Sequence, residues 1–295
     1  MKPPFDRFEP SATQWRTANA FALAHASNLA YEDDRNKIVQ QLQDWGFSAD
    51  NCRVFSVNTA QVLAAANDEM IIVAFRGTEP ARLADWLVDA EIVQKPWRNY
   101  FGEPDLGRVH YGFVRNTSSV WEQLSQFVAR ARTGKQALWI AGHSLGGAMA
   151  LIAGAAVTFS KHQPVNGIYT FGQPRTGNHA FTAHCNRRLK TSIFRVVNNQ
   201  DVVPHVPPAF IPFLLIPLHG PIFYRHAGEL LHFDAAGKLH TDRALWWRTA
   251  FRLTWTRRRQ QRQLRTAPAG FAPLDDHLLN AYIQKLQAWL DAGNL

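Results

Sequence analysis

The chain has 295 residues, of which 46% are hydrophobic and 19% are charged. This composition is that of a globular protein and excludes a disordered chain, while the length suits one α/β domain over residues 1–295. The formal net charge is +9, and eight arginines without one Asp or Glu lie between residues 243 and 274. Two cysteines, Cys52 and Cys185, exclude a disulfide framework but leave a single bridge open.

The sequence predicts neither a Sec-type leader nor a membrane span. Prolines and charged residues interrupt the first ten positions, where a leader needs an apolar core. The longest apolar stretch, residues 207–218, is shorter than the roughly 20 residues that cross a bilayer and contains Pro212 and Pro217. Localisation stays open between the cytoplasm, a membrane surface and leaderless secretion.

The N-terminal part predicts two helices and then two strands. Residues 11–31 carry apolar side chains at three- and four-residue spacing, which predicts a helix over one edge of a sheet, and residues 37–45 predict a shorter helix. Residues 53–57 and 70–75 predict strands. Because residues 70–75 are uniformly apolar, we expect a central strand that is covered on both faces.

Two candidate functional segments follow the central strand. Thr78, in the loop Arg-Gly-Thr, could direct a backbone N–H at an oxygen that becomes negative during acyl chemistry, although an ordinary glycine turn fits equally well. Residues 83–93 are amphipathic. They predict either a surface helix or, over residues 80–95, a lid that covers a site until it meets lipid.

A serine lies at the centre of the most informative stretch. Residues 137–141 are all apolar and predict a buried strand, and a helix of small residues begins after Gly146. Between them, residues 142–146 match G-x-S-x-G, in which Ser144 occupies a strained strand-to-helix turn that presents its hydroxyl. A match to five residues also arises by chance, but the flanking strand and helix favour a nucleophile.

The helix predicted at residues 117–132 and the strands predicted at 167–171 and 191–197 continue an alternation that is typical of a parallel sheet. Asp201 follows the last of these strands on a loop, where an acid that orients a catalytic histidine could lie. Most loop aspartates are structural, so position alone leaves this role open.

Taken together, these residues resemble the class 3 lipases, an α/β-hydrolase family that includes fungal triacylglycerol lipases. The matching stretches keep the family's order between about residues 70 and 285. They are residues 73–78, 85–89, 109–113, 140–147, 170–175, 198–207 and 276–282.

The resemblance implies an α/β-hydrolase fold with a core at about residues 50–285 and a mostly parallel sheet with helices on both faces. It implies Ser144 as nucleophile, Asp201 as orienting acid and His277 as general base, with Thr78 and the N–H of Leu145 as the oxyanion hole. On spacing alone other histidines compete with His277. The competitors that follow the serine are His205, His226, His232 and His240.

Two segments depart from the family pattern. Residues 207–225 form an apolar insertion that is broken by prolines, and we interpret it as a buried loop, a wall of the acyl pocket or a lipid-contacting surface. Residues 243–265, if helical, combine a tryptophan-rich face with a basic end, which favours contact with an anionic membrane over a solvated surface helix or nucleic-acid binding. As substrate or lid residues we expect Trp86, His143, Phe210 and Phe213.

These observations predict a serine hydrolase that cleaves carboxylic esters of lipids, most of all triacylglycerols. A phospholipase A1-type enzyme or another lipid carboxylesterase at a membrane surface is the alternative, and a non-catalytic lipid-binding protein is the alternative of another class. We expect no cofactor, no metal and no nucleic-acid partner.

Overall fold

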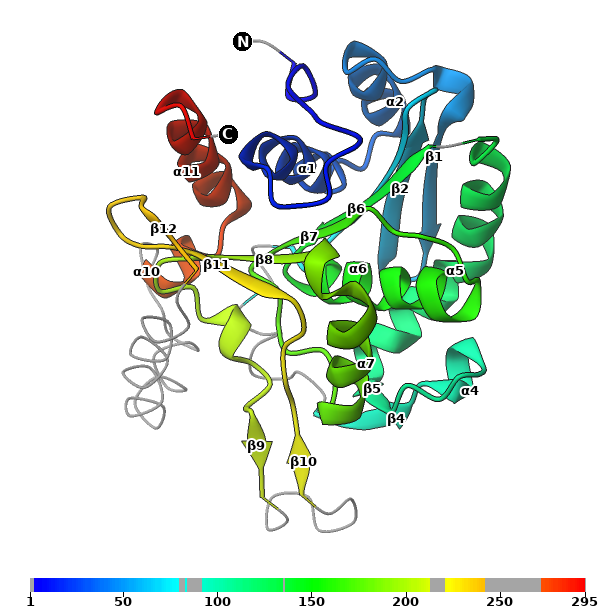
Figure 1. Cartoon of the computed structure of the whole chain (residues 1–295), viewed down its shortest axis with the longest axis vertical. Coiled ribbons are helices and arrows are strands. Elements are labelled where there is room, and N and C mark those ends of the chain that lie inside the picture. The colour runs from blue at the N-terminus through cyan, green and yellow to red at the C-terminus, as the bar shows by residue number, and fades with distance from the viewer. Residues whose placement is uncertain are drawn as a thin grey trace.

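The computed structural model describes residues 3–79, 83, 92–134, 136–212, 221–241 and 272–294. An eight-stranded sheet in the order β1-β2-β3-β6-β7-β8-β11-β12 forms its centre (Figure 1). The strands are Cys52–Val57 (β1), Ala60–Ala66 (β2), Met70–Phe75 (β3), Ala137–His143 (β6), Gly167–Phe171 (β7), Ile193–Asn198 (β8), Glu229–Phe233 (β11) and Leu239–His240 (β12).

Five neighbouring strands, β3, β6, β7, β8 and β11, run parallel, while β1, β2 and β12 are antiparallel to their neighbours. Every residue of β3, β6, β7 and β8 is buried, which explains their nearly continuous apolar sequence. Because the five strands are parallel, the loops that follow them gather at one edge of the sheet, where ligands of such folds bind.

Helices cover both faces of this sheet (Figure 1). On one face, α1 (Thr17–Leu29) packs against α11 (Leu279–Asp291) and over β3, β6 and β7, while α2 (Arg35–Asp44) contacts β1. On the other face, α5 (Tyr111–Ala131) packs against α6 (Leu145–Ala155), and α7 (His179–Leu189) shares their apolar core.

Side chains that alternate along the strands supply two separate cores. In β3, Ile71 and Val73 face the core that contains α5 and α6, whereas Ile72 faces the core that contains α1 and α11. Cys52 belongs to the α1 side and Cys185 to the α5 side, and both thiols are free and buried. The bridge that the sequence left open is therefore not formed.

The start and position of the first helix differ from the prediction. The helix begins at Thr17 instead of residue 11, because the preceding segment is fixed by the sheet: Trp15 stacks on Tyr169, and the Arg16 N–H donates to the Tyr169 hydroxyl over 3.2 Å. The helix also lies over the central strands and not over an edge. Similarly, α5 begins at Tyr111, six residues before the predicted start.

Smaller elements lie outside the main sheet. Two antiparallel ribbons are formed by β4 with β5 and by β9 with β10, and the second ribbon lies within the apolar insertion at residues 207–225. Their bounds, with those of the short helices, are Gln94–Pro96 (β4), Arg98–Phe101 (α4), Arg108–His110 (β5), Phe210–Ile211 (β9), Ile222–Phe223 (β10) and Ala272–Asp275 (α10). Short 3₁₀ or π segments occupy 49–51, 156–160, 190–192 and 203–205.

Several predicted features lie outside the described residues. These are most of the candidate lid at 80–95, including Trp86, the basic segment at 243–265, and Phe213. Within the described ranges, no helix combines the length and the apolar character needed to cross a bilayer.

Candidate active site

Ser144 lies in a strained turn between β6 and α6. Its backbone has φ 57° and ψ −129°, a conformation that costs an L-residue free energy and persists only when the surrounding structure holds it. The flanking glycines allow the turn to close: a Cβ on Gly142 would overlap the backbone of Gly146, and a Cβ on Gly146 would overlap the carbonyl oxygen of Phe75. The Ser144 N–H donates to the Phe171 carbonyl over 2.8 Å, which ties the turn to β7.

Asp201 and His277, which are 76 residues apart in the sequence, form a buried pair. The distance from His277 Nδ1 to Asp201 Oδ2 is 2.8 Å, and the two residues are only 1% and 0% exposed. The other carboxylate oxygen accepts the N–H of Val203 over 2.8 Å. Since a carboxylate only accepts, Nδ1 carries the proton of a neutral His277 and Nε2 keeps a lone pair for a base.

Gly172, directly after β7, makes room for this pair. Its φ is +60°, and an added Cβ would lie 2.7 Å from both Asp201 Oδ2 and His277 Nδ1. Asp201 and His277 therefore pack directly against the backbone of Gly172.

The reactive atoms of Ser144 and His277 have no hydrogen-bond partner among the described residues. Both Ser144 Oγ and His277 Nε2 are buried, and they do not hydrogen-bond to each other in this structure. The His277 ring lies near the end of β6, because its centroid is 4.5 Å from that of His143, the residue before Ser144. Among the described residues, the Ser144 hydroxyl and the Nε2 of His277 are thus both buried without a hydrogen-bond partner.

His143 has a different place from the one expected for a substrate or lid residue. It is buried, with its Nε2 2.7 Å from the backbone carbonyl of His277 and its Nδ1 2.8 Å from the Tyr31 hydroxyl. Burial, with a smaller effect of the neighbouring His277, lowers the pKa of His143 well below its usual range. The ring is therefore neutral, donates from Nε2 to the His277 carbonyl and accepts from Tyr31, so it helps to hold the backbone of His277 in place.

The loop after β3 passes beside the serine. A Cβ on Gly77 would lie 3.1 Å from Ser144 Cβ, so the backbone that leads to Thr78 borders Ser144. Arg76 anchors this loop through ion pairs to Asp33, at 2.6 Å, and to Glu79. Leu145 is the first residue of α6, so its N–H belongs to the helix terminus, whose donors have no acceptor within the helix.

Asp276 fixes the loop that carries Asp201. Its carboxylate accepts from the Asn199 side chain over 3.0 Å and from the Gln200 N–H over 3.1 Å, and its backbone carbonyl accepts from the Asn198 side chain over 2.9 Å. Asp276, the residue before His277, is therefore bonded to the loop that carries Asp201.

Tyr282, on α11, is a site residue that sequence reasoning missed. Its hydroxyl donates to Asp201 Oδ2 and accepts the N–H of Asn198 over 3.2 Å. Burial, and then the charge of Asp201, raise the pKa of Tyr282 well above its usual range, so the hydroxyl keeps its proton. The only sequence signal was its place five residues after His277, in one of the stretches that resemble the family.

Three of the competing histidines have other partners. His226 Nε2 lies 2.8 Å from the Pro204 carbonyl, His232 Nε2 lies 3.0 Å from the Asn199 carbonyl, and His240 pairs with Asp234 at 2.8 Å. His205 is buried in the turn after Asp201, and its carbonyl accepts from Arg175. In the part of the chain that is described, no group of three or more His, Cys, Asp or Glu side chains is placed to hold a metal ion.

Two further residues bear on access to the site. Leu83, within the candidate lid, is 3% exposed and packs against Val202 and Val203, directly after Asp201. Phe210, expected near substrate, lies on the β9–β10 ribbon with half of its side chain exposed and its ring 5.0 Å from that of Phe223.

Comparison with protein families and curated proteins gives a consistent result. The family model described as lipase (class 3) matches residues 72–211. A lipase of Caenorhabditis elegans is 27% identical over 214 residues, which cover 69% of this chain and 59% of that protein. The lipase of Rhizomucor miehei is 32% identical over 178 residues, which cover 58% and 43%. The chain thus spans about half the length of these curated relatives.

Solved structures share the fold. The Rhizomucor miehei lipase propeptide complex aligns with a TM-score of 0.55 and 23% identity over 75% of this chain and 68% of that chain. A lipase of Yarrowia lipolytica aligns with a TM-score of 0.58 and 18% identity over 73% and 78%. At these identities the likeness confirms the expected α/β-hydrolase fold.

Proposed function

This chain belongs to the class 3 lipase family, and we propose that it hydrolyses carboxylic esters of lipids through an acyl-enzyme at Ser144. The observation that carries the proposal is the buried Asp201–His277 pair, whose Nε2 has no partner among the described residues. It occurs together with a buried serine in a strained strand-to-helix turn, and His143, the residue before this serine, lies against the His277 ring. A structural serine has no need of such backbone strain.

The reaction follows from this arrangement. His277 Nε2 takes the Ser144 proton while Oγ attacks the ester carbonyl, and Asp201 holds the resulting imidazolium through Nδ1–H. The negative oxygen of the tetrahedral intermediate accepts from the N–H groups of Thr78 and Leu145. The imidazolium then protonates the departing alcohol. Water, activated by the same Nε2, attacks the acyl-enzyme and releases the fatty acid and the free serine.

We propose triacylglycerols as the main substrate, with acyl chains of phospholipids as the alternative. The sequence of a triacylglycerol lipase of Arabidopsis thaliana matches over 56% of this chain, which supports this choice of substrate class. Comparing fatty-acid release from emulsified triglyceride and from mixed phospholipid micelles distinguishes the two. Release from phospholipid alone would contradict the preference.

We also propose that Leu83, the described residue within the candidate lid, covers the approach to the site in the absence of lipid. The burial of Ser144 and His277 and the packing of Leu83 on the loop of Asp201 support this proposal. A side chain that leaves a nonpolar contact to open the site gains from contact with a lipid surface. The rate of hydrolysis should therefore rise sharply when the concentration of a short-chain ester exceeds its solubility and an emulsion forms. A rate that shows no such rise at the solubility limit would contradict the proposal.

Ser144→Ala tests the mechanism. We expect it to lower the rate of ester hydrolysis at least about 10³-fold because the nucleophile is lost, while the circular dichroism spectrum stays unchanged. Ser125→Ala, on α5, is the matched control and should keep full activity. An organophosphate should add one covalent group to the wild type and none to Ser144→Ala. Unchanged hydrolysis in that variant would overturn the proposal, and an unreactive wild type would favour a non-catalytic lipid-binding protein.

A further inference from the structure

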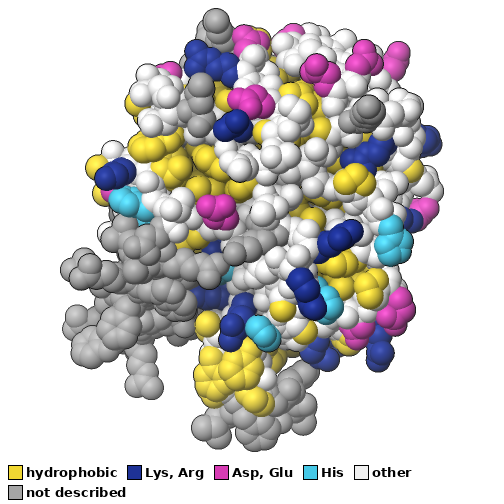
Figure 2. All heavy atoms as spheres, viewed as in Figure 1, with side chains coloured by type: hydrophobic (Ala, Val, Ile, Leu, Met, Phe, Trp, Pro, Cys, Tyr) yellow, Lys and Arg dark blue, Asp and Glu magenta, His cyan; other side chains and the backbone are white. Residues whose placement is uncertain are grey.

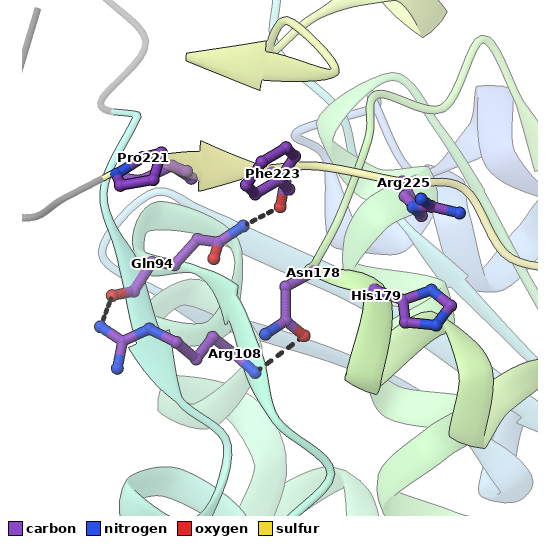
Figure 3. Close-up of a pocket in the computed structure, with 8 residues that line it drawn as sticks. Gln94, Arg108, Asn178, His179, Pro221, Phe223 and Arg225 are labelled. Atoms are coloured by element: carbon purple, nitrogen blue, oxygen red, sulfur yellow. Dashed lines mark hydrogen bonds between the residues drawn. The ribbon is translucent and has the colours of Figure 1, made fainter. Parts of the chain in front are cut away.

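A groove formed by described residues lies apart from the Asp201–His277 pair, none of its lining residues being shared with that pair. It has a volume of about 420 Å³ and lies between the β4–β5 ribbon, the start of α7 and β10. Figure 3 shows Gln94 and Arg108 on one side of this groove, His179 and Arg225 on the other, and Phe223 along its border. The groove therefore lies at the base of the β9–β10 ribbon.

The groove is cationic. Arg108 and Arg225 line it with His179, and its described lining residues include no carboxylate. The Arg108 guanidinium donates to the backbone carbonyl of Gln94 over 2.8 Å, and Arg225 has no side-chain partner among the described residues. Both arginines are exposed. Two guanidinium groups without a neutralising acid attract an anion that offers several acceptor oxygens, such as a phosphate ester.

An exposed aromatic pair adjoins this charge. Phe210 and Phe223 face each other across the ribbon and are 51% and 50% exposed, and Leu278 is the only other large hydrophobic residue that is exposed among the described residues. The opposite face of the ribbon, with Ile211 and Ile222, is buried against Ile92.

The ribbon places the aromatic and basic side chains on one face. Burial alternates from β10 into the residues that follow it: Ile222 and Tyr224 are buried, whereas Phe223 and Arg225 are exposed, so the exposed pair lies on one side. Figure 2 shows hydrophobic side chains over β9 and β10 at one end of the molecule, with Lys, Arg and His side chains next to them. Aromatic rings with adjacent arginines fit the boundary of an anionic membrane, where rings enter at the headgroup level and guanidinium groups meet phosphates.

We propose that this surface, defined by Phe210, Phe223, Arg108 and Arg225, docks the protein on an anionic phospholipid surface. The two rings enter the boundary between headgroups and acyl chains, and the groove takes lipid phosphate. A free phosphate would use the arginines alone and leaves the exposed rings unexplained. The proposal goes beyond ester hydrolysis, because docking does not require a reactive serine.

Vesicle sedimentation tests the proposal with the full chain carrying Ser144→Ala, so that no lipid is hydrolysed. We expect binding to vesicles of phosphatidylcholine mixed with phosphatidylglycerol and much weaker binding to phosphatidylcholine alone. Adding Arg225→Gln should weaken binding to the anionic vesicles about fivefold, and the effect should shrink as salt screens the charge. Adding Phe223→Ser should weaken it about tenfold, and Phe223→Trp should preserve it.

Arg130→Gln, an exposed arginine on α5, is the control for net charge and should change binding little. An equal loss with Arg130→Gln would overturn the proposal. So would unchanged binding of the ribbon variants together with loss on replacing Arg257, Arg258, Arg259 and Arg262, which would place docking in residues 243–265.

Hydrolysis of a water-soluble ester separates this proposal from the catalytic one. In the chain with Ser144 present, Arg225→Gln and Phe223→Ser should leave that rate unchanged. If the wild type fails to hydrolyse any ester, the catalytic proposal fails, and the vesicle result still decides the docking proposal. A loss of soluble-ester hydrolysis in both ribbon variants would instead place this surface in the substrate pocket.

Discussion

At the scale of single residues, position 172 has no space for a side chain. The φ of Gly172 is +60°, and a Cβ would lie 2.7 Å from Asp201 Oδ2 and from His277 Nδ1. Gly172→Ala should therefore separate the acid from the base and abolish ester hydrolysis. Gly237→Ala is the matched control, because φ is +81° there and nothing lies within 4 Å of the added atom. It should cost about 1 kcal/mol of stability and keep full activity. Equal activity of the two variants would contradict this prediction, because it would show that a side chain at position 172 does not disturb Asp201 and His277.

Tyr282 offers a test of how the acid is held. Tyr282→Phe removes a donor from the buried carboxylate of Asp201 and an acceptor from the Asn198 N–H. We expect the free energy of unfolding in urea to fall by about 1.5–3 kcal/mol, together with a lower kcat on a soluble ester, since the orienting acid loses its support. Tyr100→Phe, whose hydroxyl makes no hydrogen bond to a described residue, should change neither quantity. A lower stability with an unchanged kcat would restrict Tyr282 to a structural role.

The sequence pointed to the candidate catalytic residues more clearly than to the residues that hold them in place. Ser144 was marked by its motif, and the resemblance implied Asp201 and His277, which the structure brings into contact; their catalytic roles remain predictions. Tyr31 and Tyr282 carried no comparable signal, because each meets the site across at least 81 positions of sequence. Such contacts depend on how α1 and α11 pack over the sheet, which local patterns do not specify.

At the scale of elements, the close approach of α6 to β3 can be tested with two glycines of one helix. A Cβ on Gly146 would overlap the backbone carbonyls of Phe75 and Arg76, whereas a Cβ on Gly154 would meet the end of the Ile168 side chain. The backbone of β3 and of Arg76 is fixed by the sheet, whereas the Ile168 side chain can change its rotamer. Gly146→Ala should therefore shift the helix start, destabilise the fold and remove activity. Gly154→Ala should be tolerated, because alanine favours a helix by about 1 kcal/mol over glycine. Thermal unfolding and a soluble-ester assay measure both effects.

Elements with a strong local signal were predicted well. The strand at residues 167–171 has the predicted bounds, and the uniformly apolar residues 70–75 form a fully buried strand. Residues 60–66 carried no strand signal, because four of the seven are alanine, yet they form β2 between β1 and β3. Pairing with two neighbours decides the conformation there, and a sequence read locally does not contain that information.

At the scale of the whole molecule, buried histidines predict the response to acid. Burial lowers the pKa of His25, His143, His226 and His232 in the folded protein. In the unfolded chain a histidine has a pKa of about 6.5, so below that pH the unfolded state binds more protons. Stability is therefore complete above about pH 7 and falls as the pH drops below 6.5, by at most about 1.4 kcal/mol per pH unit for each histidine.

Urea unfolding between about pH 7 and pH 5 measures this slope. His25→Gln should reduce the slope, because burial alone lowers the pKa of His25. The carboxyl of Asp276 acts in the opposite direction at lower pH, because burial raises its pKa. A stability that stays constant over this range would contradict the prediction.

The contacts of Asp276 also bear on how the protein could be lengthened. Asp276 is bonded to the loop that begins at Asn198, 78 positions earlier in the chain. These bonds close a long loop, and each doubling of the length of such a loop adds only about 0.6 kcal/mol of closure entropy. A foreign domain inserted between residues 241 and 272 would therefore leave the bonds between Asp276 and the loop of Asp201 in place, and we expect the protein to accept such a fusion partner there.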